Sequence, residues 1–294
     1  MNVNRREFLE KSAKAAAVAV IASTIPASIT RGGEGSPRSA THVLKQAEGN
    51  RMKDQQASNY YISRKSKLLE NFDKQALKYS RKALVPHFGD DLTDTILRNV
   101  RQEYETIIPK LPYIGGENNI NTTFLIMSAG CLAIYKVLKV HDMTAEQIGR
   151  VIFEMAEART YAYPKFFLRL VGRLKYGKKY EVYLKEQAAQ SQRRQHHGDW
   201  VFTFVEGDRR EFDYGLDFTE CGACKLFHDH GADELAPYFC LPDFVFSKAF
   251  NRGLVRSMTL AEGYDRCDFR YKRGRETFLA PLRDGWPPQF VKHV

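Results

Sequence analysis

The chain has 294 residues, 43% hydrophobic and 27% charged, with a net charge of +10. This composition supports one sizeable core or two small ones and excludes disorder over most of the length. The basic residues are scattered, and no zinc-finger spacing or aromatic RNA-binding pattern accompanies them, so we expect no nucleic-acid partner. Most of these residues are expected to be solvated surface, and the partner that the charge favours is a small anionic molecule.

The first 30 residues predict an export signal. The pair Arg5-Arg6 precedes two bulky apolar residues, as in the twin-arginine signal, and an apolar run from Ala15 to Ala22 follows. That run is shorter than the roughly 20 residues needed to span a bilayer. We therefore expect recognition by the Tat export machinery and a periplasmic or exported protein. An amphipathic N-terminal helix or a retained anchor is the alternative.

Helical periodicity dominates the chain after a polar linker at residues 31–58. Between Tyr60 and Ile108, apolar residues recur every three to four positions, which predicts amphipathic helices that pack on a common core. The proline- and glycine-rich segment 109–116 is expected to end this helical stretch.

Capping residues predict the next helices. Asn121 and the threonines after it are expected to cap a helix that ends near Val140. Thr144 and Gln147 have the spacing of a capping box, which predicts another helix start. Residues 168–192 predict a basic amphipathic helix.

The period changes after residue 195. Residues 199–206 and 212–220 predict two strands joined by a hairpin-like turn, and 254–261 and 266–271 predict a second pair. Short helices broken at Gly231 and Pro242 are expected between the pairs. Helices followed by strands predict an α+β fold in which a bundle-like helical half precedes an antiparallel sheet with short helices.

These patterns divide the chain into five parts. They are a signal peptide (1–30), a linker (31–58), a helical region (59–195), a cysteine-containing α/β module (196–275) and a C-terminal tail (276–294).

Four of the five cysteines fall within residues 213–272, and we expect the chemistry of the protein there. Cys221 and Cys224 form a CxxC, which can be a redox pair, half of a metal site or two packed thiols. Lys225 follows where a covalent haem motif requires histidine, so no covalent haem is expected. Cys131, on an apolar helix, is expected to be buried in the core. The cofactor stays unknown; the candidate ligands for a divalent metal such as zinc are Cys221, Cys224, His228, Cys240 and Cys267.

The segment Cys240-Leu-Pro-Asp243 is the strongest candidate for catalysis. It places a thiol and a carboxylate three residues apart, beside a proline that helps to fix the turn. A thiolate near a charged partner is a competent nucleophile or metal ligand.

Three longer segments extend this pattern: 217–221 (DFTEC), 231–243 (GADELAPYFCLPD) and 259–270 (TLAEGYDRCDFR), with 108–116 (IPKLPYIGG) upstream. Together they resemble the L-2-amino-thiazoline-4-carboxylic acid hydrolase family. The last segment is also similar to ligand-binding domains of the vinyl-reductase type, which implies an α/β module with a ligand cavity.

The hydrolase resemblance implies ring opening of a small carboxylated cyclic amidine at a C–N or C=N bond, giving an N-carbamoyl-cysteine-like product. Cys240 could attack the C=N carbon directly, or Cys240 and Asp243 could hold a metal whose bound water attacks. Glu220 or Asp243 could carry the proton. The candidate cations for the substrate carboxylate are Arg256, Arg270 and Lys272.

Two other functions stay open. The chain could be an exported binding or sensing module of the vinyl-reductase-like type, in which the cysteines hold a metal or a disulfide without turnover. A CxxC redox protein is the third alternative, and the lack of a thioredoxin-like βαβ pattern around Cys221 counts against it.

Overall fold

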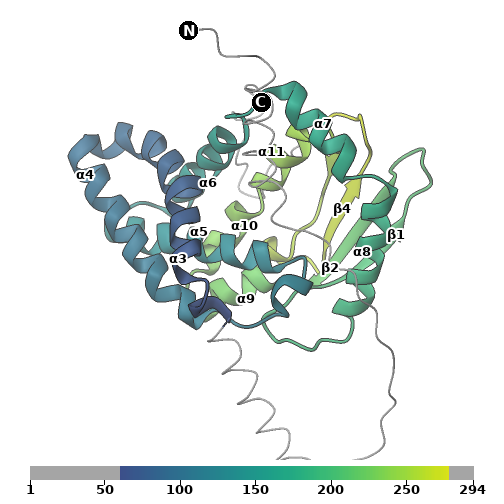
Figure 1. The fold of residues 1–294 in the computed structure, drawn as a ribbon, viewed down its shortest axis with the longest axis horizontal. Helices are drawn as coiled ribbons and strands as arrows, with labels where there is room; N and C mark the ends of the chain where they lie inside the picture. Colours follow the sequence, from purple (N-terminus) through teal and green to yellow (C-terminus); the bar gives the residue numbers. More distant parts are fainter. Residues whose placement is uncertain (1–59, 278–294) are drawn as a thin grey trace, which may run out of the picture.

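The computed structural model of the chain describes residues 60–277. The predicted signal peptide and linker, and most of the predicted C-terminal tail, lie outside these residues. Helices form the first half, and a four-stranded sheet with short helices follows beside them (Figure 1). The predicted α+β class is therefore confirmed.

The first helices form the predicted helical stretch. α3 (Lys65–Phe72), a π-helical turn (Asp73–Leu77) and α4 (Lys78–Ile107) run continuously, with a kink at Gly89, where φ is 70°. Glycine adopts this left-handed conformation without the steric cost that a side chain would bring. After the kink, α4 buries one stripe at three-to-four spacing: Ile96, Val100, Tyr104 and Ile107.

The next two helices begin where the sequence predicts. α5 (Thr122–Val140) has Asn121 at its N-cap position, but the Asn121 side chain does not cap the helix. α6 (Ala145–Thr160) begins with the predicted capping box: the Gln147 backbone N–H donates to Thr144 Oγ1, and the Thr144 N–H donates to the Gln147 side chain.

Within residues 60–277, α5 is the helix that is long and apolar enough to cross a membrane by length and composition. However, 56% of its apolar window is buried inside the fold, and α5 packs against α4, α6 and α9. We therefore interpret α5 as the central core helix of the helical half.

The predicted helix at residues 168–192 is two helices, α7 (Lys165–Lys175) and α8 (Lys178–Ser191). Gly177 has an extended backbone and forms the N-cap of α8, which separates the two. Gly172 lets α7 approach closely, because a Cβ there would lie 2.1 Å from the Phe250 carbonyl oxygen.

The strands form one antiparallel sheet in the order β1-β2-β4-β3. β1 (Val201–Glu206), β2 (Tyr214–Glu220) and β4 (Cys267–Tyr271) match their predicted positions. β3 (Leu254–Val255) is much shorter than the predicted strand at 254–261. The sheet buries one face against α8 and α11 through a largely aromatic and aliphatic cluster: Phe202, Tyr214, Leu216, Tyr271, Leu184, Ala188 and Phe244.

The shortening of β3 has a clear physical cause. The Asp268 carboxylate accepts hydrogen bonds from the backbone N–H groups of Ser257 (2.9 Å) and Met258 (2.7 Å) and from the Ser257 hydroxyl (2.6 Å). These groups are therefore satisfied by a side chain instead of by a neighbouring strand.

The short helices between the strand pairs are α9 (Gly222–Asp229), α10 (Ala236–Phe239) and α11 (Pro242–Ala249). The breaks fall at the predicted residues, since Gly231 has a φ of 64° and Pro242 is the first residue of α11. α9 packs into the same hydrophobic cluster as α4, α5 and α6, through Ala223, Leu226 and Phe227. The cysteine-bearing module and the helical half thus share a core.

Candidate thiol site

Four cysteines come together where β2 ends and β4 begins. Cys221 follows β2, Cys224 lies in the first turn of α9, Cys240 follows α10, and Cys267 is the first residue of β4. The thiols are close enough for their charges to interact. The fifth cysteine, Cys131, is buried in α5, as its sequence context predicts. The fold therefore assembles the four cysteines of the predicted block into one cluster.

Cys221 is the thiol whose environment favours the charged form. A hydrogen bond from the Cys224 thiol lowers the pKa of Cys221 most; burial opposes this, and nearby backbone N–H groups at the start of α9 and the Trp200 side chain add to the lowering. The same hydrogen bond and burial raise the pKa of Cys224. The pair is therefore asymmetric: its environment favours the charged form at Cys221 more than at Cys224, whose thiol donates the hydrogen bond between them.

Close packing explains why a glycine, Gly222, follows the first cysteine of the CxxC. A Cβ at Gly222 would lie 2.4 Å from the Gly198 carbonyl oxygen and 2.6 Å from the Trp200 ring. Only glycine therefore lets the buried Trp200 pack directly on the start of α9, from where its side chain interacts with Cys221. The sequence analysis did not identify Trp200, because nothing in the spacing of a CxxC points to a residue 21 positions upstream.

Cys240 has the opposite electrostatics. Burial raises its pKa well above the usual range of a thiol, and the nearby Arg256 guanidinium opposes this only in part. Burial also raises the pKa of Asp243, again against the effect of Arg256. Cys240 and Asp243 are both half-buried, and the Cys240 thiol favours its protonated form.

Arg256 holds Cys240 and Asp243 in place. Its Nη1 lies 2.8 Å from Asp243 Oδ2, and its Nη2 donates to the Cys240 carbonyl oxygen at 3.0 Å. The guanidinium lies over the rings of Phe244 and Phe269. The Arg256 side chain is only 2% exposed, whereas that of Asp243 is 31% exposed. This arrangement suits a positioning residue better than direct contact with a substrate.

Cys267 completes the cluster as a protonated thiol. Burial raises its pKa to about 12, although the Leu260 backbone N–H donates to its sulfur at 3.2 Å. This bond ties the loop after β3 to the first residue of β4.

The predicted proton carrier Glu220 ends β2, directly before Cys221. Its carboxylate forms ion pairs with Lys225 and Arg194. Lys225 also donates to the backbone carbonyl oxygens of His197 (2.8 Å) and Asp199 (3.1 Å). Burial lowers the pKa of Lys225, and the charge of Cys221 acts in the opposite direction. Lys225 therefore places a positive charge near Cys221.

A second group that the sequence analysis missed lies around Asp199, next to Trp200. The Asp199 carboxylate accepts from Asn119 Nδ2 at 2.5 Å and from the Trp200 backbone N–H at 2.7 Å, and burial raises its pKa. Asn119 also donates to the Ile114 carbonyl oxygen at 2.6 Å. The network therefore fastens the glycine-rich segment after α4 to the residues directly before β1.

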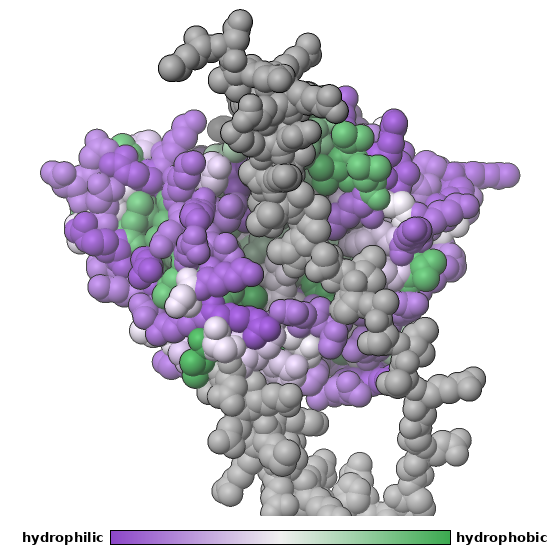
Figure 2. Space-filling model, viewed as in Figure 1, coloured by the Kyte–Doolittle hydropathy of each residue, from purple (hydrophilic) through white to green (hydrophobic). Residues whose placement is uncertain are grey.

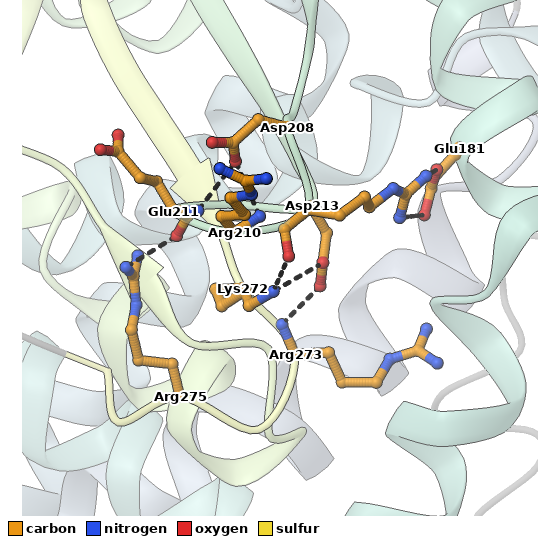
Figure 3. A network of polar contacts seen from close by, with 9 residues as sticks. Glu181, Asp208, Arg210, Glu211, Asp213, Lys272, Arg273 and Arg275 are labelled. Carbon is orange, nitrogen blue, oxygen red and sulfur yellow. Dashed lines mark hydrogen bonds and ion pairs between the residues drawn. The ribbon is translucent and has the colours of Figure 1, made fainter.

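The predicted substrate cations are not all near the cysteines. Arg270 pairs with Asp217 (Nη1–Oδ1, 2.7 Å). Both residues lie on the sheet face opposite the helices, because they alternate along their strands with the residues that pack against the helices. Lys272 lies beyond the far end of β4, where it contacts Asp213 Oδ1 at 3.4 Å and the Arg209 carbonyl oxygen at 2.5 Å (Figure 3). Of the three predicted cations, Arg256 alone is close to the thiols.

The five candidate metal ligands do not form a common site. His228 is 78% exposed and its Nδ1 lies 2.9 Å from Asp233 Oδ1. Across residues 60–277, no group of three or more His, Cys, Asp or Glu side chains has a geometry that could hold a metal ion. Binding of zinc by these residues stays a prediction, and we derive no chemical step from a metal.

An α+β fold with an asymmetric thiol pair at a strand–helix junction defines a protein suited to thiol chemistry on a small molecule. The family model described as L-2-amino-thiazoline-4-carboxylic acid hydrolase matches residues 123–271, from α5 to β4, and the chain belongs to this family. The match includes all four clustered cysteines. No curated protein and no solved structure matches the chain significantly.

Proposed function

We propose that the protein hydrolyses a small carboxylated cyclic amidine related to L-2-amino-thiazoline-4-carboxylate, and that Cys221 is the nucleophile. Membership of the family suggests a hydrolase of such substrates. The observation that carries the assignment of Cys221 is the asymmetry of the thiol pair. The hydrogen bond between the two thiols lowers the pKa of Cys221 and raises that of Cys224, while burial raises the pKa values of Cys240 and Cys267.

In the first step, the Cys221 thiolate attacks the C=N carbon of the thiazoline ring. The ring C–S bond breaks, and the departing sulfur takes the proton of the Cys224 thiol, the hydrogen-bond partner of Cys221. The product of this step is an S-amidino adduct on Cys221 with a thiolate at Cys224. No atom leaves the substrate, because the broken bond is within its ring.

In the second step, water attacks the amidino carbon and gives one proton to the Cys224 thiolate. The remaining hydroxyl proton moves to the amidino nitrogen, the bond to Cys221 breaks, and the urea group of the N-carbamoyl product forms. Cys221 returns as the thiolate and Cys224 as the thiol. Lys225 stabilises the thiolate and attracts the carboxylated substrate through its positive charge.

Hydrolysis by the purified protein tests this proposal. L-2-amino-thiazoline-4-carboxylate is supplied, and the N-carbamoyl product is measured by chromatography for the parent chain and for Cys221→Ser, Cys224→Ser, Cys240→Ser and Cys131→Ala. We expect Cys221→Ser to abolish turnover and Cys224→Ser to lower kcat by about 10²-fold or more. The matched control Cys131→Ala removes a core thiol outside the cluster and is expected to leave kcat unchanged.

The same assay separates the alternatives. Loss of turnover in Cys240→Ser, with activity retained in Cys221→Ser, would support the arrangement in which Cys240 attacks and Asp243 or Glu220 carries the proton. A parent chain that binds the thiazoline without converting it would favour the non-catalytic binding module.

We also propose that residues 1–30 direct export by the twin-arginine route. The support is the sequence of this segment alone. Replacement of both Arg5 and Arg6 by lysine is expected to retain the protein in the cytoplasm, as measured by cell fractionation. Unchanged export of that variant would refute the proposal.

A further inference from the structure

A cavity of about 750 Å³ lies away from the cysteines, at the opposite end of β2 and β4. There Tyr214 and Tyr271 are register partners, whereas Cys267 pairs with Phe218 at the other end. The cavity lies between α7, the start of α8, these strand ends and the loop after α11. Its volume is typical of small-molecule sites.

Arg252 is a half-buried cation in the lining of this cavity. Its guanidinium carbon lies 4.2 Å from the ring centroid of Tyr176 and 4.0 Å from that of Tyr271, and its Nη2 donates to the Tyr214 hydroxyl at 2.9 Å. Its Nε is buried and has no hydrogen-bond partner. Among residues 60–277, no carboxylate lies within ion-pairing distance of Arg252. A half-buried guanidinium with a buried, unpartnered Nε and no ion-paired carboxylate can form an ion pair with an anionic ligand.

The charge around the cavity is mainly positive. Six cationic and two anionic side chains line it, which leaves an excess of four positive charges. The two acids already have partners: Glu181 accepts from Arg209 at 2.8 Å, and Asp213 binds Lys272 and the backbone N–H of Arg273 (Figure 3). The site therefore favours an anion.

The mouth of the cavity is apolar. Phe166 and Leu170 of α7 line it and are 68% and 48% exposed, and Leu174, four residues further on, is 76% exposed. Their four-residue spacing puts them on one face of the helix. Figure 2 shows a hydrophobic patch on the surface over α7. Solvent-exposed apolar side chains beside a ligand cavity mark a surface that binds apolar groups.

We propose that this cavity binds a single-chain amphiphilic anion, with its acidic headgroup at Arg252 and its alkyl chain along Phe166 and Leu170. The headgroup is a carboxylate or a phosphate monoester. Guanidinium groups bind both the planar carboxylate and the tetrahedral phosphate through paired hydrogen bonds. This site is separate from the thiol cluster, and its occupancy requires no turnover there.

Calorimetric titration of the full chain with dodecyl phosphate, below its micelle concentration, tests the proposal. Laurate is titrated separately and identifies the preferred headgroup. Three controls are titrated in the same way. Dodecanol tests the alkyl chain without a charge, dodecyltrimethylammonium tests the alkyl chain with a positive charge, and inorganic phosphate tests the headgroup without an alkyl chain. We expect an acidic amphiphile to bind at least about tenfold more tightly than any of these three.

Variants locate the site. Arg252→Gln is expected to weaken binding of the acidic amphiphile by about tenfold or more. Phe166→Ser, on the exposed face of α7, is expected to weaken it without a risk to folding. The control Lys82→Gln changes a residue that lines a different cavity and should leave binding unchanged. Equal binding of the cationic amphiphile, or binding that survives both Arg252→Gln and Phe166→Ser within twofold, would overturn the proposal.

Discussion

The ion pair between Arg256 and Asp243 is predicted to stabilise the fold, and Arg256→Met removes it with little change in volume. The variant loses the bonds to Asp243 (2.8 Å) and to the Cys240 carbonyl oxygen (3.0 Å). Removing one partner of a buried pair costs about 3–5 kcal/mol, because the other charge stays without compensation. Since 31% of the Asp243 side chain is exposed, water can solvate it in part, and we expect a loss near the lower limit, about 3 kcal/mol.

Urea unfolding measures this loss as a lower midpoint with an unchanged slope. The matched control is Arg81→Met. Arg81 pairs with two carboxylates but is 42% exposed, so the unfolding midpoint of this variant should stay within experimental error of the parent. The double variant Arg256→Met/Asp243→Leu is expected to regain part of the loss, because no uncompensated charge remains. A loss in Arg256→Met no larger than in Arg81→Met would refute the reasoning.

Three further predictions follow from the thiol site and the core. Gly222→Ala is expected to destabilise the protein by about 1–3 kcal/mol in urea unfolding, because the new Cβ overlaps neighbouring atoms, whereas Gly177→Ala meets no atom within 4 Å and should be nearly neutral. The rate of Cys221 alkylation by iodoacetamide is measured against pH by peptide mass spectrometry, and it should reach half its maximum at a lower pH than for an ordinary thiol. In Cys224→Ala this midpoint pH should rise. An unchanged midpoint would contradict the assigned hydrogen bond. Burial raises the pKa of Cys131 from 9.0 to about 12, so the stability that its neutral form contributes is complete below pH 9 and is lost as the pH rises toward 12. Urea unfolding of Cys131→Ala at pH 8 to 11 should therefore show a smaller alkaline loss than the parent.

Local sequence signals were sufficient for most of the fold. The capping box at Thr144 and the breaks at Gly231 and Pro242 act on neighbouring residues, and each appears where the spacing places it. The strand from Leu254 was predicted too long, because the side chain that ends it, Asp268, comes from the next strand.

The thiol site was predictable only in part. The cysteines of the predicted block do converge, but their spacing carries no information on which thiol accepts hydrogen bonds. The Cys224 and Trp200 side chains both lower the pKa of Cys221, and the contact with Trp200 depends on the packing of this residue, directly before β1, against the start of α9. The position of Arg270 could not be predicted from the sequence either. Strand register is a tertiary property, and it decides which face of the sheet a strand residue occupies.

The most direct test of the central claim is intact-protein and peptide mass spectrometry after rapid mixing with L-2-amino-thiazoline-4-carboxylate. Because ring opening expels no atom, the proposed intermediate adds the full mass of the substrate to the chain, and we predict that this mass maps to Cys221. It should be absent in Cys221→Ser and persist longest in Cys224→Ser, in which the base for the second step is missing. Turnover by the parent chain with an adduct on Cys240, or an adduct that still forms in Cys221→Ser, would contradict the account.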